Sequence, residues 1–240
     1  MRLIFTALLV FGATSIVLNL DRWAQKTPYS LSRLPYINVQ AKYQTLLLAV
    51  ALTMLVMLYL FNPSNFTRFF ALGNPSAPAA AVALFGIAEG ESWLTVGGSL
   101  TLFITLATAT FTFLQFRKLK GGLMRLIPFT PYVLLFSLSN SFAEEVIYRL
   151  GVIVPLAGAI EPQYILIFSA IAFGTPHLRG MPNGIVGALM AGVLGWLLAK
   201  SMLETSGMFW AWAIHFVQDV VVFSGLVLNA IHSQSRAEKD

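Results

Sequence analysis

The sequence contains no cysteine, which excludes disulfide bonds and thiolate metal sites. Charge is also scarce, since Asp, Glu, Lys and Arg make up 10% of the 240 residues. An ordinary soluble domain carries about 25% charged residues, so this chain cannot coat a water-facing surface and a soluble globular protein is excluded. What is abundant is apolar: 57% of the residues are hydrophobic and the mean hydropathy is +0.76. The composition predicts an integral membrane protein.

Long apolar runs predict about seven membrane-spanning helices, because crossing roughly 30 Å of hydrocarbon takes about 20 residues. Separate spans must be helical, since an isolated strand cannot satisfy its backbone polar groups in lipid. The predicted fold class is therefore an all-α polytopic membrane bundle with about six to eight spans. The runs are 3–20, 43–61, 93–116, 127–159, 164–173, 185–199 and 208–231. A shorter apolar piece, 77–88, should lie at the interface or pack under a loop.

Basic residues gather after the first and the third run, and this predicts the orientation in the membrane. These residues are Arg22, Lys26, Arg33, Lys42, Arg117, Lys118, Lys120 and Arg125. Two basic loops separated by two crossings belong on the cytoplasmic side. Seven crossings then place the N-terminus outside and the tail with Arg236 and Lys239 inside, and we expect the inner (cell) membrane of a bacterium. The net charge of +5 is explained by topology and by contact with anionic lipid, not by nucleic-acid binding.

Ionisable side chains inside spans are costly and functional by default, and the second half of the chain holds several of them. The first group is Glu144-Glu145-x-x-x-Arg149. Glu145 and Arg149 are four residues apart, so on a helix they share a face and can pair. Glu144, about 100° further round the helix, is left as an independent carboxylate. The alternative is a purely structural Glu–Arg pair with one water-exposed glutamate at a helix end.

Two further groups supply histidines. His177 follows Pro176, which should disturb regular helix, and a lone histidine there could be merely interfacial. His215 and Asp219 project from one helix face, so Asp219 can fix the tautomer of the imidazole, although a helix–helix hydrogen-bonded pair is an alternative. Together Glu144, His177 and His215 suit the activation of a water molecule in a membrane cavity. They suit a His/His/Glu metal site equally well.

In this order on late helices, the three motifs resemble those of the CPBP family of intramembrane proteases. They are Glu-Glu-x-x-x-Arg at 144–149, Phe-x-x-x-His at 173–177 and His-x-x-x-Asp at 215–219. That family includes the CAAX prenyl endopeptidases of the Rce1 type and bacterial bacteriocin-immunity proteins. The similarity covers roughly residues 127–226.

The resemblance implies hydrolysis of a peptide bond in a membrane-associated protein or peptide. It implies that Glu144 is the general base, that His177 helps to hold the water, and that Glu145 and Arg149 brace the site as an ion pair. His215 and the residue at position 219 would stabilise the oxyanion. An ionised Asp219 cannot donate a hydrogen bond, so it must be protonated or must act by orienting His215, and the helical spacing favours the orienting role.

The resemblance leaves the cofactor open, because the family has been described both as metalloproteases and as metal-independent glutamate proteases. We expect no cofactor, since the His-Glu-x-x-His signature is absent. A catalytic zinc on Glu144, His177 and His215 is the alternative.

Three regions are expected along the chain: a transmembrane region with basic loops over 1–126, a catalytic transmembrane core over 127–232 and a polar tail over 233–240. The expected partners are a membrane-associated protein or peptide substrate and the lipid bilayer, with no nucleic acid. One alternative is a non-catalytic immunity or scaffold protein of the same fold, against which the intact set of buried charges argues. Another is a proton-coupled transporter, which is less favoured because the sequence shows no inverted repeat.

Overall fold

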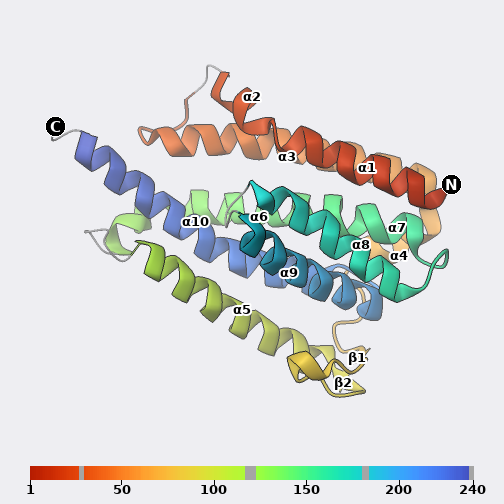
Figure 1. Ribbon diagram of the computed structural model, residues 1–240. Helices are drawn as coiled ribbons and strands as arrows, with labels where there is room; N and C mark the ends of the chain where they lie inside the picture. Colours follow the sequence, from red (N-terminus) through yellow and green to blue (C-terminus); the bar gives the residue numbers. More distant parts are fainter. Residues whose placement is uncertain (27–29, 117–122, 180–183, 238–240) are drawn as a thin grey trace.

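The computed structural model describes residues 1–26, 30–116, 123–179 and 184–237, and nearly all of them are helical (Figure 1). This confirms the predicted all-α membrane bundle. The helices are α1 (Arg2–Val17), α2 (Leu20–Lys26), α3 (Pro35–Phe61), α4 (Pro63–Phe70), α5 (Trp93–Phe116), α6 (Thr130–Glu145), α7 (Gly151–Leu156), α8 (Pro162–Gly174), α9 (Gly184–Thr205) and α10 (Phe209–Ala237). A π-helical turn, Val146–Leu150, joins α6 to α7, and 3-10 turns occupy Ala83–Phe85, Leu123–Phe129 and Thr175–Leu178.

Six stretches of the described chain are long and apolar enough to cross a membrane, which lies within the predicted range. They are 2–26, 35–61, 93–115, 124–156, 184–205 and 209–237. The predicted span 164–173 falls in α8, which has 13 residues and so a length of about 20 Å, less than the thickness of the hydrocarbon layer. Pro162 begins this helix, and α8 ends two residues before Pro176. In Figure 1 α8 nevertheless runs back along α9, with which it is in contact.

Two lysines assigned to loops or span ends are buried in helices instead. Lys42 was expected in a loop, but α3 begins at Pro35 because proline suits the first helical turn, so Lys42 lies inside the helix and is buried. Lys200 follows the predicted end of the sixth run, yet α9 continues to Thr205, and Lys200 is buried beside its ion-pair partner Glu204. The basic residues Arg117, Lys118, Lys120 and Lys239 lie outside the described residues.

The apolar piece 77–88 lies at one end of the bundle (Figure 1). It forms part of a small hairpin in which β1 (Pro78–Ala79) pairs antiparallel with β2 (Glu91–Ser92). Glu204 of α9 anchors this hairpin, because it accepts hydrogen bonds from the backbone N–H of Ala80 and from Nε1 of Trp93. The buried side chain of Ala77 adds an apolar contact to the core.

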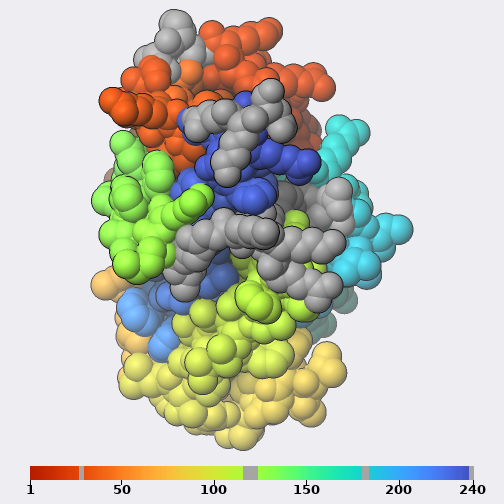
Figure 2. All heavy atoms as spheres, turned by 90° about the vertical axis from the view of Figure 1, so that its left-hand side faces the viewer, coloured from red at the N-terminus to blue at the C-terminus, as the bar shows by residue number. Residues whose placement is uncertain are grey.

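The late helices form the middle of the molecule. The pair α1 and α3 covers one side, through contacts of α1 with α7 and of α3 with α6, and α5 covers the other side by packing on α10. Figure 2 shows the same order from one end of the bundle, with red and orange α1–α3 above blue α10 and yellow-green α5 below. Apolar side chains from the early and the late helices share one core cluster. The central layer is therefore the place where a buried site can be built.

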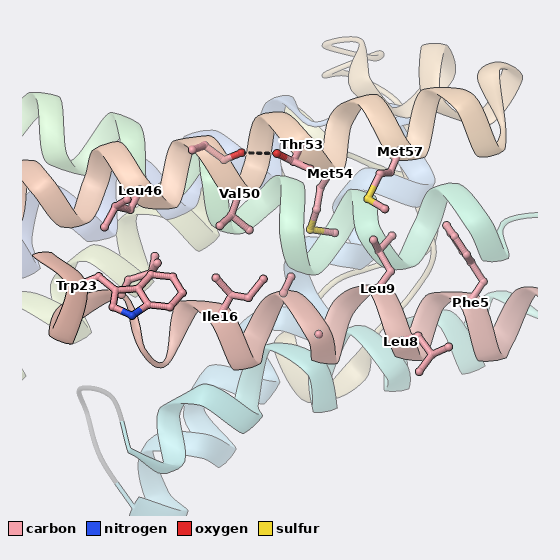
Figure 3. Close-up of a pocket in the computed structure, with 14 residues that line it drawn as sticks. Phe5, Leu8, Leu9, Ile16, Trp23, Leu46, Val50, Thr53, Met54 and Met57 are labelled. Atoms are coloured by element: carbon pink, nitrogen blue, oxygen red, sulfur yellow. Dashed lines mark hydrogen bonds between the residues drawn. The ribbon is translucent and has the colours of Figure 1, made fainter.

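A groove opens on the surface between α1 and α3 (Figure 3). Its volume is about 560 Å³ and its lining is almost wholly apolar, with Leu9 and Ile16 on α1 facing Val50 and Met54 on α3. The one hydroxyl in the lining, that of Thr53, donates a hydrogen bond to the backbone oxygen of Ala49. Such a groove suits contact with lipid.

Candidate active site

The Glu-Glu motif lies where α6 passes into the π-helical turn Val146–Leu150. Turns of this kind are rare and occur frequently at functional sites. Every residue of the turn is buried, and the expected ion pair is present across it: Nε of Arg149 lies 3.1 Å from Oε2 of Glu145, with both side chains fully buried.

The positive charge of Arg149 has a second neighbour. Its guanidinium carbon lies 3.9 Å from the ring centroid of Phe173 on α8, which is a cation–π contact. The approach to Glu145 is close without hydrogen-bond geometry, and no guanidinium nitrogen has a hydrogen-bond partner among the described residues. The ion pair and the aromatic ring are therefore what stabilise this buried charge.

His215 lies on α10 against the two glutamates. Its Nδ1 is 2.7 Å from Oε1 of Glu145, and its Nε2 is 3.4 Å from Oε2 of Glu144 and 3.7 Å from Oδ1 of Asp219. The closest partner of His215 is thus Glu145 on another helix, not the Asp219 suggested by the helical spacing. Glu145 contacts Arg149 through one oxygen and His215 through the other.

Glu144 differs from its neighbour in its access to the exterior. The side chain of Glu144 is 17% exposed, whereas that of Glu145 is 0% exposed. The two glutamates therefore face different surroundings, as their angular separation on a helix predicts. Of these two glutamates, Glu144 is the one with a partly exposed side chain.

Asp219 makes its hydrogen bond to α6. Its Oδ2 accepts from Nδ2 of Asn140 over 3.1 Å, and Oδ1 of Asn140 accepts from Nε2 of Gln44 on α3 over 3.2 Å. Neither Asn140 nor Gln44 was among the residues predicted to belong to the site. Asn140 stands four residues before Glu144 and so on the same helix face, which is a signal that could have identified it. Gln44 was detectable only as a polar residue near the start of an apolar run.

His177 is half-buried on the 3-10 turn after α8. Its Nδ1 lies 2.9 Å from the backbone oxygen of Phe173, to which it donates, and in a neutral ring Nε2 is then an acceptor. The ring of Phe173 packs edge-on against both histidines, with centroids 5.0 Å from His177 and 5.6 Å from His215. The structure thus brings Glu144, Glu145 and His215 into direct contact and joins His177 to them through an aromatic ring.

A family model described as type II CAAX prenyl endopeptidase Rce1-like matches residues 126–221. This segment of the chain is Rce1-like. The match confirms the resemblance inferred from the three motifs, all of which it contains. The helices from α1 to α5 lie outside it. Comparison with curated proteins and with solved structures gave no match.

Phe173 is the residue of the Rce1-like segment that the sequence analysis quoted without giving it a role. It is buried and touches Arg149, His177 and His215. A glycine on α9 makes room for it, because a Cβ atom on Gly195 would lie 3.0 Å from Cβ of Phe173. Phe173 therefore contacts both histidines and the arginine of the Glu-Glu-x-x-x-Arg motif.

The Rce1-like segment does not assemble the zinc shell considered above. Among the described residues, no group of three or more His, Asp or Glu side chains could hold a metal ion. In the expected set of Glu144, His177 and His215, the first and last approach each other, but His177 makes its described contacts with Phe173. The arrangement of these three side chains therefore does not fit a metal ion.

Proposed function

We propose that this membrane protein is an endopeptidase that hydrolyses a peptide bond of a membrane-associated protein or peptide. The observation that carries the proposal is that the two adjacent glutamates differ in their contacts and in their exposure. One oxygen of Glu145 contacts Arg149 and the other contacts His215, while Glu144 keeps access to the exterior. The Rce1-like match supports the protease class.

Glu144 suits the role of general base. A carboxylate within reach of a water molecule can accept its proton as the oxygen attacks a carbonyl carbon. The proton then passes to the amide nitrogen, which leaves as an amine when the C–N bond breaks. In the neutral form of His177, Nε2 is an acceptor and suits the positioning of that water.

His215 suits the stabilisation of the oxyanion that forms during this attack. Glu145 fixes the ring by accepting from Nδ1, and Nε2 faces the carboxylates of Glu144 and Asp219. A doubly protonated imidazole matches this arrangement, because both nitrogens then donate. A donor aimed at a developing oxyanion contributes about 3 kcal/mol to catalysis. Asp219 would act through His215, by keeping the ring in an orientation from which Nε2 can reach the oxyanion.

The test compares purified wild type with Glu144→Ala in proteoliposomes, on a library of membrane peptides analysed by mass spectrometry. We expect Glu144→Ala to lower cleavage at least about a hundredfold, because it removes the base. Glu161→Ala is the matched control, since Glu161 is an exposed glutamate at the start of α8 and its removal should leave cleavage unchanged.

Equal cleavage by wild type and Glu144→Ala would overturn the proposal. Proton-coupled uptake that is lost in Glu144→Ala would favour a transporter instead. The assay is repeated after chelation on protein whose zinc content has been measured. Cleavage that survives in zinc-free protein supports a metal-independent mechanism with Glu144 as the base, and cleavage that returns only with added zinc contradicts it.

A further inference from the structure

A chain of side-chain amides links α3 to the candidate site. Gln44 donates to Asn140 and Asn140 donates to Asp219, over 3.2 and 3.1 Å. Gln44 is 3% exposed and Asp219 is 7% exposed. Two hydrogen bonds thus join three helices in the interior, where such bonds are strong and an unmatched polar group is costly.

We propose that Gln44 and Asn140 are positioning residues that fix the carboxylate of Asp219 beside His215. An ionised carboxylate can only accept, so Asn140 must turn its NH₂ group toward Asp219 and its oxygen toward α3. Position 44 must then supply a donor, and Nε2 of Gln44 does so. With Oδ2 of Asp219 held in this way, Oδ1 is left 3.7 Å from Nε2 of His215.

The burial of Gln44 supports a specific role for its amide. Its Oε1 has no hydrogen-bond partner among the described residues, which is unfavourable for a buried polar atom. An apolar side chain would avoid this cost in a helix as apolar as α3. The N–H donor of Gln44 therefore explains why position 44 holds an amide and not an apolar side chain. Gln44 also lies outside residues 126–221, so the early helices contribute to the site of the Rce1-like segment as well as covering it.

The donor-to-acceptor direction of the two hydrogen bonds can be reversed by substitution. Gln44→Glu replaces the donor by an acceptor, so Asn140 turns its NH₂ group toward α3 and presents its oxygen to the carboxylate of Asp219. Adding Asp219→Asn restores a donor at that contact. For the purified full-length protein in nanodiscs, we expect Gln44→Glu to lower the melting temperature by about 5 °C. The double variant should recover most of this loss.

Two controls separate the network from general charge effects. Gln40→Glu makes the same change one turn earlier on α3, where the side chain is half-buried, and its effect should simply add to that of Asp219→Asn. In an Asn140→Leu background the recovery should disappear, because the connecting amide is gone. Additive effects of Gln44→Glu and Asp219→Asn, or a recovery that persists without Asn140, would overturn the proposal.

The consequence for catalysis rests on the proposed peptidase activity. Once a cleaved peptide is known, Asn140→Leu should lower kcat roughly tenfold or more with KM near the wild-type value, because it displaces a group that acts through His215. An unchanged kcat in folded Asn140→Leu would overturn the positioning role. The two proposals can fail separately. If the double variant of Gln44 and Asp219 recovers its melting temperature but wild type and Glu144→Ala cleave equally, the network is supported and the proposed function is overturned.

Discussion

At the scale of single residues, the chemistry of the site depends on which carboxylate oxygens already contact another side chain. The spacing of Glu145 and Arg149 predicts their pairing, because residues four apart lie on one helix face. The contact of Glu145 with His215 joins side chains 70 positions apart, and no local pattern reports such a distance. The sequence therefore identifies the members of the site, while the partner that orients His215 comes only from the packing of α10 on α6.

Asp219 gives a prediction at the same scale. Its Oδ2 is taken by Asn140 and its Oδ1 faces His215, which favours an indirect role for its negative charge. We expect Asp219→Asn to lose about tenfold or more of the activity, nearly as much as Asp219→Ala. Asn140 would take the one amide oxygen at position 219, so that an NH₂ group, which cannot accept, would face Nε2 of His215. The measurement is kcat on a cleaved peptide, with the melting temperature as a check of folding.

The opposite result for Asp219 would be equally clear. Substantial activity in Asp219→Asn, with little in Asp219→Ala, would show that position 219 donates a hydrogen bond directly. The orienting role would then be wrong, because an asparagine amide can replace a protonated aspartic acid as a donor.

At the scale of elements, the limits of prediction lie in irregular helix. Hydrophobic runs identify where helices exist, since spans must be apolar. The run 185–199 ends before the charge of Lys200, however, and so misses the extension of α9 to Thr205. The π-helical turn Val146–Leu150 has no signature in the sequence comparable to a proline. Pro176, by contrast, predicted a disturbance of regular helix, and the 3-10 turn that contains His177 lies there.

The packing of α9 on α8 makes a prediction about Gly195. A Cβ atom there would lie 3.0 Å from Phe173 Cβ and 3.3 Å from the backbone oxygen of Ser169. Gly195→Ala should therefore lower the melting temperature by about 3–8 °C through overpacking. It should also reduce cleavage, because Phe173 contacts both histidines. Gly98→Ala on α5 is the control, since an added Cβ would meet nothing within 4 Å there. Equal melting temperatures for the two variants would contradict the prediction.

At the scale of the whole molecule, the order of the layers could not be predicted. Composition predicts a membrane bundle, and the motifs place the site in the later helices. Neither states that α1 and α3 lie on one side of these helices and α5 on the other (Figures 1 and 2). Layer order follows from the fit of side chains between distant helices, which an apolar run of Leu, Val and Ala does not encode.

The path of the chain predicts its orientation in the membrane. In Figure 1 the hairpin β1–β2 lies at one end of the bundle and the C-terminal end of α10 lies at the other. Four long apolar helices follow the hairpin, and an even number of crossings would return the chain to the same side. The two ends can therefore face opposite sides of the membrane only if α8 also crosses it, despite its 13 residues. We propose that it does, with the hairpin and the N-terminus outside and the C-terminal end of α10 in the cytoplasm, as the distribution of basic residues favours.

The absence of cysteine makes this orientation measurable, because the wild type has no thiol to label. In intact cells, a membrane-impermeant maleimide should label Glu89→Cys, an exposed position beside the hairpin, and should not label Ala237→Cys, an exposed position at the end of α10. Both should react once the membrane is permeabilised. The reverse pattern would invert the orientation. Labelling of both positions in intact cells would mean that the chain crosses an even number of times between them, so that α8 enters and leaves the bilayer on one side.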